Sequence, residues 1–479
     1  MEVASSASVV LVDRWTPRFG AAGRSRRMSR LRTEPLPEFV VLCALVVVLN
    51  VVGLVMILSA SSVVALASHK PAWYFFDRQL AWTAAAAVVF VIAVRCPYRS
   101  WMRAARSLLV VSAVLLAAVL IPHVGTLVDG SRRWLALGPI RIQPAEIAKV
   151  GLLLAGTDLL ARRTHRLRNW TSWRPVVVWM AGLSGLVMLE PDLGSTLMLM
   201  LIGIGLLVAA GVRRRALATL TVFTLTAVTV LALSEPYRRA RLLTFLHPSA
   251  DPSGKGYQLR QSFIALGHGG VFGVGLGAGR AKWLYLPNPH TDFIFAVIGE
   301  ETGLIGALLL IGMFAGLAVL GFRIARRAPD RLGQLLAAGV TIWISGQAII
   351  NIGAVIGVLP VTGIPLPFVS FGGSSLLVTM FAAGILANIA NQTHPRQTTA
   401  RRQDRLVVPG MRPATGTPTS GAVQNGRSAR NRRAAQSSRG HVEPQRDVGP
   451  VHIRTRRGST RCWQRWRFVT FTRRSLRRA

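Results

Sequence analysis

Ten apolar runs, separated by short polar segments, follow one another along most of the chain. They lie near residues 39–60, 76–95, 106–122, 145–161, 174–190, 192–211, 216–233, 292–322, 333–358 and 370–391. Each run approaches or exceeds the roughly 20 residues that an α-helix needs to cross the hydrocarbon core of a bilayer. The pattern predicts an all-α polytopic membrane protein with about ten transmembrane helices over residues 39–391.

The arginines predict which side of the membrane each connecting loop occupies. If the N-terminus is cytoplasmic, the inside segments are 96–105, 162–173, 212–215, 323–332 and the C-terminal tail, and all of them carry arginine. This is the distribution that the positive-inside rule requires, with both termini cytoplasmic. The external loops are then 61–75, 123–144, 190–192, 234–291 and 359–369.

Loop 234–291, between the seventh and eighth helices, is the largest external loop. It also carries Arg238, Arg239 and Arg241, but long loops cross the membrane largely regardless of their charge. Its part 257–264 has the composition of a short amphipathic helix lying on the membrane.

Composition separates two terminal extensions from this membrane domain. Residues 1–38 form a polar, basic arm, and residues 392–479 are rich in Arg, Gln, Ser, Thr, Pro and Gly. Both are expected to be disordered and cytoplasmic, and the tail is either a solvated segment or a docking segment for anionic lipid or an acidic partner. A net charge of +38 would indicate nucleic-acid binding in a soluble protein, but 51% hydrophobic residues and a mean hydropathy of +0.41 indicate a membrane protein. No nucleic-acid partner is therefore expected.

The three cysteines predict no metal site or disulfide framework. Cys43, Cys96 and Cys462 are scattered along the chain without metal-ligand spacing.

A polar, proline-rich stretch before the eighth run ends in a carboxylate. Thr291 is predicted to cap the helix and Asp292 to lie on its first turn, where the helix dipole favours an ionised acid. Glu300 and Glu301 follow about 12 Å deeper, where carboxylates are costly and usually functional. The simpler alternative is that Asp292 only complements the helix dipole and Glu300 holds a neighbouring helix.

The second external loop contains cations that run against the positive-inside trend. Arg132, Arg133 and Trp134 form an Arg-Arg-Trp sequence, which suits either a phosphate or diphosphate partner or an interfacial anchor with snorkelling arginines. Glu146 and Lys149, three residues apart, are predicted to pair on one face of the fourth helix.

Two further polar segments lie on the external side. Asp192, next to Glu190, is interpreted either as a dipole partner of the sixth helix or as a second acid facing Asp292. Residues 357–375 contain three prolines and cannot form a spanning helix. Ser370 and Ser374, at the end of this segment, suit a polar headgroup or simply cap a turn. The glycines between 269 and 279 do not spell a nucleotide-binding loop, so that function is rejected.

Taken together, these residues resemble the SEDS family (shape, elongation, division and sporulation), to which the FtsW and RodA proteins belong. The resemblance covers residues 39–391 in order. It rests on the segments GSRRW…QPAEIAK, EPDLGS, YQLRQS, GVGLG, PHTDFIFAVIGEE and NIG…LPVTGIPLPFVSFGGSS. The long extensions and the QPAE form favour the FtsW type over RodA.

The resemblance implies a peptidoglycan glycosyltransferase that polymerises lipid II at the outer face of the bacterial cytoplasmic membrane during cell division. The alternatives are a lipid II flippase, a RodA-type elongation polymerase, and an inert membrane scaffold whose tails recruit division proteins. No inverted repeat, which would favour a transporter, is visible. A polymerase needs a base for the attacking hydroxyl and cations for the departing diphosphate.

The resemblance also implies the residues and partners of this activity. Asp292 is the expected catalytic base. The expected substrate-binding residues are Arg132, Arg133, Trp134, Glu146, Lys149, Asp192, His290, Glu300, Ser370 and Ser374. The expected cofactor is a divalent cation (Mg or Mn), although Asn288 stands where many relatives have a metal-binding Glu. The expected partners are lipid II, a class B penicillin-binding transpeptidase and, through the tails, other division proteins at the septum.

Overall fold

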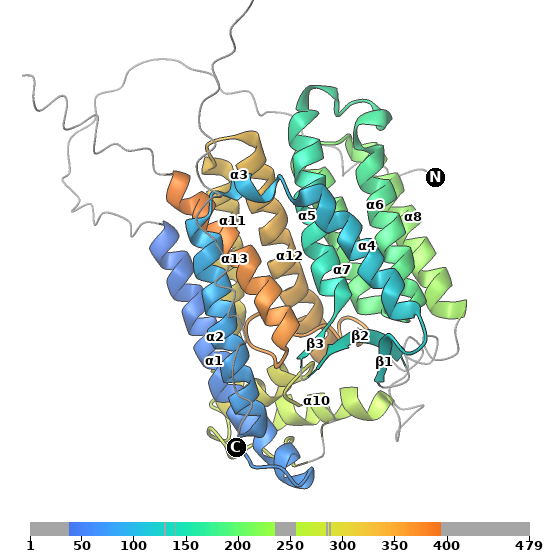
Figure 1. Cartoon of the computed structure of the whole chain (residues 1–479). Coiled ribbons are helices and arrows are strands. Elements are labelled where there is room, and N and C mark those ends of the chain that lie inside the picture. Colours follow the sequence, from blue (N-terminus) through green and yellow to red (C-terminus); the bar gives the residue numbers. More distant parts are fainter. Residues whose placement is uncertain are drawn as a thin grey trace, which may run out of the picture. The chain divides into compact units, whose positions relative to one another are not determined.

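The computed structural model describes residues 38–128, 131–138, 140–234, 255–283, 286 and 289–393. The predictions for the N-terminal arm up to residue 37, for the tail from residue 394, for Arg238, Arg239 and Arg241, and for Asn288 lie outside these residues. The described part is mainly helical, with one small sheet at one end of the helices (Figure 1).

Ten of the helices coincide with the ten apolar runs of the sequence. They are α1 (Glu38–Ala67), α2 (Tyr74–Arg95), α4 (Ala105–Leu120), α5 (Pro144–Arg162), α6 (Trp170–Leu189), α7 (Leu193–Ala210), α8 (Arg214–Ser234), α11 (Ile294–Arg327), α12 (Arg331–Val355) and α13 (Gly373–Thr393). The described connections between them contain three shorter helices, α3 (Tyr98–Trp101), η1 (Thr164–Arg166) and α10 (Lys255–Gly269).

The described helices have the length and hydropathy of a polytopic membrane protein, as predicted. Seven of them, α1, α2, α6, α7, α11, α12 and α13, are long and apolar enough to cross a membrane, and α4 is a shorter apolar helix. The number of crossings, predicted as ten, and the side of each loop stay predictions. Helix α10 also contains the amphipathic segment expected at 257–264.

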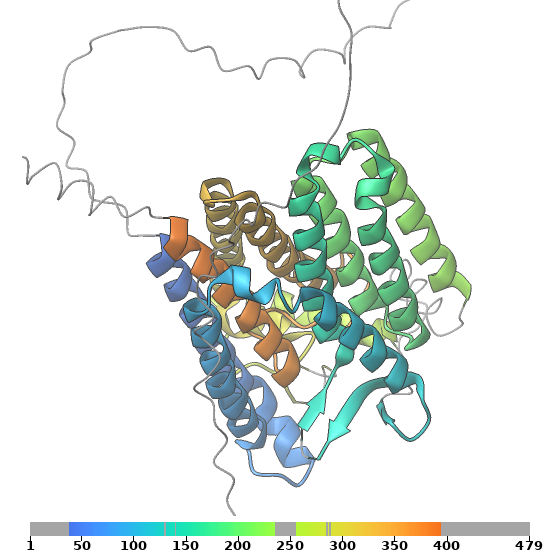
Figure 2. The ribbon, with the colours of Figure 1, turned by 45° about the horizontal axis from the view of Figure 1, so that its top comes forward.

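An antiparallel sheet, which the sequence did not predict, occupies the loop between α4 and α5. Its strands are β1 (Gly125–Val128), β2 (Ser131–Leu137) and β3 (Ile140–Ile142), with β2 in the centre. In the pairing, Thr126 lies opposite Trp134 and Leu135 opposite Ile142. Because side chains alternate between the faces of a strand, neighbouring residues of β2 point in opposite directions. The sheet, α10 and the turn between α1 and α2 lie at the same end of the helices (Figures 1 and 2).

Helix α11 is broken at Gly303, two residues beyond Glu301. Gly303 has a φ of 69° inside the helix, and the loop after α10 lies against this break. The amide of Val274 donates to the carbonyl of Glu300 (3.0 Å), and the amide of Leu304 donates to the carbonyl of Gly270 (2.9 Å). A Cβ at Gly303 would lie only 2.3 Å from the amide nitrogen of Gly273. The close approach and the positive φ both require glycine here.

The proline-containing segment between α12 and α13 is not helical, as predicted. Helix α12 ends at Val355 and α13 begins at Gly373. Side chains of α12 hold this segment: Gln347 Nε2 donates to the carbonyl of Pro365 (2.9 Å), and Asn351 Nδ2 donates to that of Ile364 (2.7 Å). Buried backbone groups without regular structure need such partners. The segment is thereby fixed against α12.

Candidate functional site

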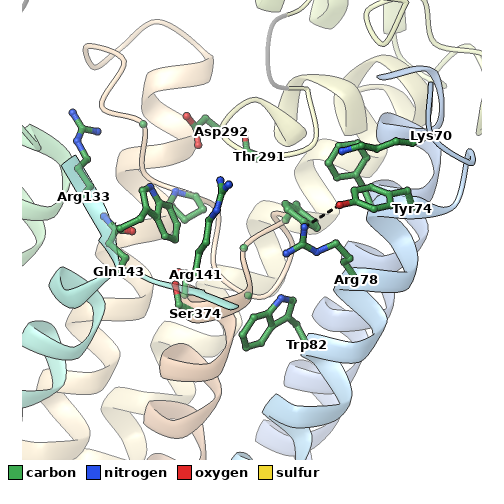
Figure 3. A pocket seen from close by; sticks show the side chains of 18 of the residues that line it. Lys70, Tyr74, Arg78, Trp82, Arg133, Arg141, Gln143, Thr291, Asp292 and Ser374 are labelled. Carbon is green, nitrogen blue, oxygen red and sulfur yellow. Dashed lines mark hydrogen bonds between the residues drawn. The ribbon is translucent and has the colours of Figure 1, made fainter. Parts of the chain in front are cut away.

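A pocket of about 690 Å³ lies where α2, the sheet, the start of α11 and the 363–375 segment meet. This volume is within the range of small-molecule binding sites. Its walls carry Asp292, four basic residues and several aromatic side chains, shown in Figure 3. The pocket lies at the end of the helices that the arginine distribution assigns to the outside.

Asp292 lies before α11, not on its first turn. The helix begins at Ile294 with Phe293 as the flanking residue, so the predictions of Thr291 as the helix cap and of Asp292 in the first turn were wrong. The physical reason is tertiary: the carbonyls of residues 290–292 bond to other segments, which keeps them out of the helix. Asp292 is half-buried and lines the pocket.

Three consecutive backbone carbonyls hold this stretch in place. The carbonyl of His290 accepts from the amide of Phe371 (2.9 Å). That of Thr291 accepts from Ser370 Oγ (2.6 Å), and that of Asp292 from Asn351 Nδ2 (2.9 Å). The Asp292 side chain therefore leaves a backbone whose position is fixed by the loop between α12 and α13.

His290 is buried beside the pocket and is neutral. Its ring lies 4.7 Å from the ring of Phe75 and 5.5 Å from that of Phe371, centroid to centroid. Burial lowers the pKa of His290 to about 4, because a charged imidazole would lose its hydration. At neutral pH, His290 packs as an aromatic ring and does not supply a positive charge.

The two arginines of the second external loop are separated by the sheet. Arg133 and Trp134 line the pocket, whereas Arg132 lines neither this pocket nor the smaller chamber described below. Arg133 donates to the carbonyls of Glu190 (3.2 Å from Nε) and Pro191. The alternation along β2 explains why only one member of the pair reaches the pocket.

A chamber of about 100 Å³ adjoins the pocket and contains three of the other predicted residues. It is lined by Glu146, Lys149 and Asp192, and it shares Arg133 and Gln143 with the pocket. Lys149 Nζ lies 2.9 Å and 2.8 Å from the two carboxylate oxygens of Glu146. This confirms the predicted pairing on one face of α5.

The remaining acids of the prediction bond to other groups of the chain. Asp192 caps α7: it accepts from the amide (3.0 Å) and hydroxyl (2.8 Å) of Ser195 and from Gln143 Nε2 (3.0 Å). Glu300 accepts from the amides of Arg280 (2.8 Å) and Ala281 (3.0 Å). Asp192 is thus adjacent to the pocket, whereas Glu300 holds the loop after α10 and is absent from the pocket lining.

The two predicted serines have different positions. Ser374, at the start of α13, lines the pocket. Ser370 is buried behind it, where its hydroxyl donates to the Thr291 carbonyl and accepts from the Leu366 amide (2.8 Å).

The structure adds cations that the sequence reasoning missed. Lys70, Arg78 and Arg141 also line the pocket. For Lys70 and Arg141 the available signal was the one that identified Arg133, namely basic residues in predicted external loops against the positive-inside trend. For Arg78 it was a charged residue inside the predicted spanning run 76–95.

Glu190 is a buried acid that lies behind Arg133. It is 1% exposed, and neither carboxylate oxygen has a hydrogen-bond partner within the described part of the chain. Burial, assisted by the neighbouring charge of Asp192 and opposed by Arg133, raises the pKa of Glu190 to about 8. The carboxyl is therefore protonated at neutral pH.

The chain is similar to proteins of one family over most of its length. The model of the FtsW/RodA/SpoVE family, described as a cell cycle protein, matches residues 40–395. A probable peptidoglycan glycosyltransferase FtsW of Mycobacterium bovis is 40% identical over 387 residues, which cover 81% of this chain and 74% of the relative. The corresponding protein of Geobacter metallireducens is 38% identical over 353 residues, or 74% and 94% of the two chains.

Solved structures show the same similarity. A chain from a study of the structural coordination of polymerization and crosslinking by a peptidoglycan synthase complex has a TM-score of 0.61 at 29% identity. The rod shape determining protein RodA of Thermus thermophilus has a TM-score of 0.55 at 28% identity. In each case, 74% of this chain and 97% of the other chain are covered.

We expect the stability of the protein to depend on pH through Glu190. Because its pKa is higher in the folded than in the unfolded protein, the folded state binds more protons between about pH 4.5 and 8, and stability falls as pH rises through this window. Glu190→Gln mimics the protonated carboxyl and should flatten this fall, measured as the midpoint of thermal unfolding in detergent. Asp77→Asn, at an exposed position of α2, is the control. An equal pH slope in Glu190→Gln and the wild type would contradict the assignment.

Proposed function

The chain belongs to the FtsW/RodA/SpoVE family of cell cycle proteins, and from this premise we propose that it is a membrane-embedded peptidoglycan glycosyltransferase whose catalytic base is Asp292. The curated relatives at 38–41% identity carry this activity in their names. The proposed substrate is lipid II, a disaccharide-peptide linked through a diphosphate to a lipid.

The composition of the pocket lining is the observation that supports Asp292 as the base. Of the described residues that line the pocket, Asp292 is the single acid, and it stands among Lys70, Arg78, Arg133 and Arg141. A carboxylate close to the substrate hydroxyl can accept a proton, and a cation beside the leaving group, here Arg133, can stabilise developing phosphate charge.

The reaction then follows from this arrangement. Asp292 takes the proton from the 4-hydroxyl of the acceptor sugar, and that oxygen bonds to the anomeric carbon of the donor. The bond between this carbon and the diphosphate oxygen breaks, and the diphosphate leaves with the electron pair. Arg133, on the wall of the pocket, stabilises the leaving charge. A single displacement on an α-linked donor gives a β-linked product, so one base is sufficient.

The other predicted residues have supporting roles in this proposal. Trp134 and Ser374 contact the substrate at the pocket wall, and Glu146, Lys149 and Asp192 shape the adjoining chamber. His290 and Ser370 fix the backbone beside Asp292. Substrate binding by Arg132 and Glu300 is also part of the proposal. Neither residue lines the pocket, so the pocket does not support this role.

The residues present do not form a metal site by themselves. Within the described ranges, no three His, Cys, Asp or Glu side chains are grouped so that they could hold a metal ion. Mg²⁺ in phosphate-handling sites is commonly bound through one or two carboxylates together with substrate phosphates. Asp292 would be the protein ligand of an Mg or Mn ion, and such an ion would supply further charge neutralisation.

The cellular role proposed is cell division, with a class B penicillin-binding transpeptidase as partner and the septum as location. The FtsW names of the relatives support division, and the similar chain in a peptidoglycan synthase complex supports a partner. Depletion of the protein is expected to give filamentous cells. Rounded cells would instead indicate a role in elongation.

Replacement of the base tests the enzymatic proposal. Asp292→Asn in the full chain, purified with its transpeptidase and supplied with lipid II, is expected to lose about 10²–10⁴-fold in the rate of glycan synthesis, which is the usual contribution of a general base. Asp77→Asn serves as the control, because Asp77 is exposed and does not line the pocket. Divalent ions are varied in the same assay. Near-normal glycan synthesis by Asp292→Asn would overturn the assignment, and lipid II translocation that survives in this variant would favour a flippase.

A further inference from the structure

The basic residues of the pocket form two groups on opposite walls. Lys70 and Arg78 come from the start of α2 and the turn before it, and Arg133 and Arg141 come from β2 and β3. Figure 3 shows Lys70, Tyr74 and Arg78 on one side and Arg133 on the other, with Arg141 and Asp292 in the middle. One cationic wall would be sufficient for a single diphosphate, so the second wall needs its own explanation.

Tyr74 and Arg78 lie on one face of α2, because they are four residues apart, the spacing of neighbours on a helix surface. Lys70 precedes the helix. Arg78 donates from one terminal nitrogen to the Tyr74 hydroxyl (3.1 Å), and Lys70 Nζ lies 4.3 Å from the centroid of the Tyr74 ring. Tyr74 therefore orients both cations toward the same space.

No acid of the described residues forms an ion pair with this group. None of the six ion pairs found among the described residues involves Lys70 or Arg78. Both side chains are exposed, so they can bind an anion without first breaking an ion pair. Arg78 points into the pocket, although it lies on a helix long and apolar enough to span a membrane.

The proposed reaction requires two diphosphates near one base. The donor breaks a bond at its own diphosphate, whereas the acceptor reacts at a sugar hydroxyl that lies a disaccharide away from its diphosphate. Like-charged groups repel strongly in a partly buried site, so the two diphosphates need separate cationic partners. The sheet wall, with Arg133, holds the leaving diphosphate in the mechanism above.

We propose that Lys70, Tyr74 and Arg78 form a second anion subsite, which binds the diphosphate of the lipid-linked acceptor. This inference rests on the proposed function for the identity of the acceptor, and on the pocket geometry for the subsite. The acceptor diphosphate stays intact during the reaction. The subsite therefore contributes to substrate binding and not to the chemical step.

Steady-state kinetics distinguish a contribution to substrate binding from a contribution to the chemical step. In Lys70→Gln/Arg78→Gln, we expect the lipid II concentration for half-maximal glycan synthesis to rise about tenfold or more, with the maximal rate within about twofold of wild type. Loss of charge-assisted hydrogen bonds gives changes of this size. The matched control is Arg103→Gln/Arg106→Gln, which removes two exposed arginines that do not line the pocket. An unchanged half-saturating concentration, or a large loss of maximal rate alone, would overturn the subsite.

A binding measurement tests the subsite without glycan synthesis. Farnesyl diphosphate, titrated into the detergent-solubilised full chain, should bind at two sites in the wild type and in the arginine control. It should bind at one site in Lys70→Gln/Arg78→Gln and at one in Arg133→Gln/Arg141→Gln. Two sites of unchanged affinity in the α2 variant would contradict the proposal. If the wild type synthesises no glycan but shows this pattern, the proposed function fails and the anion subsite stands.

The phosphate of a phospholipid headgroup has the same chemistry as the diphosphate of the acceptor. A competition experiment distinguishes these two ligands. Farnesyl diphosphate is titrated again in the presence of phosphatidylglycerol at equal mole ratio. Retention of both diphosphate sites supports a substrate subsite. Loss of only the site that depends on Lys70 and Arg78 identifies a headgroup site and overturns the proposal.

Discussion

Three hydrogen bonds to consecutive backbone carbonyls determine the position of the proposed catalytic acid. The carbonyls of residues 290–292 accept from the Phe371 amide, the Ser370 hydroxyl and the Asn351 amide group. These donors come from α12 and from the segment before α13. Because the carbonyls are engaged there, they do not enter the helix, and α11 begins only at Ile294. Asp292 is thus held by a tertiary contact and is not carried on a helical turn.

Asp292 differs from the neighbouring acids in its surroundings. Glu146 is paired with Lys149, Asp192 caps a helix, and Glu300 binds backbone amides. Glu190 is buried, and its raised pKa keeps it neutral at pH 7. Among the acids of the described residues, Asp292 is the one that lines the pocket beside basic side chains, which is where an anionic substrate with a reactive hydroxyl would bind.

The sequence predicted those features that depend on local pattern. The apolar runs gave the helices, the spacing of Glu146 and Lys149 gave their pairing, and the prolines between 357 and 375 gave a non-helical segment. Each of these follows from hydrophobicity, helix periodicity or proline geometry over a few residues. The family resemblance then supplied the activity.

Other features depend on contacts between distant segments and could not be predicted from local pattern. The strand β2 separates Arg133 from Arg132, but its pairing depends on β1 and β3. The start of α11 depends on Asn351 and Ser370, about 60 and 80 residues downstream of the Asp292 and Thr291 carbonyls that they bind. Arg78 lines the pocket from α2, a helix that packs beside α13, far away in the sequence.

The most direct test of the central claim is the maximal rate of glycan synthesis by Asn351→Ala, which removes the hydrogen bond to the Asp292 carbonyl. Small misplacements of a catalytic group can cost about 10²-fold in rate. The reference is Asn388→Ala, which removes a buried asparagine bonded to the carbonyl of Val94. We predict that Asn351→Ala loses at least about tenfold in maximal rate, with half-saturation and thermal midpoint equal to those of Asn388→Ala. A maximal rate equal to that of Asn388→Ala would contradict the view that this backbone contact holds the catalytic acid.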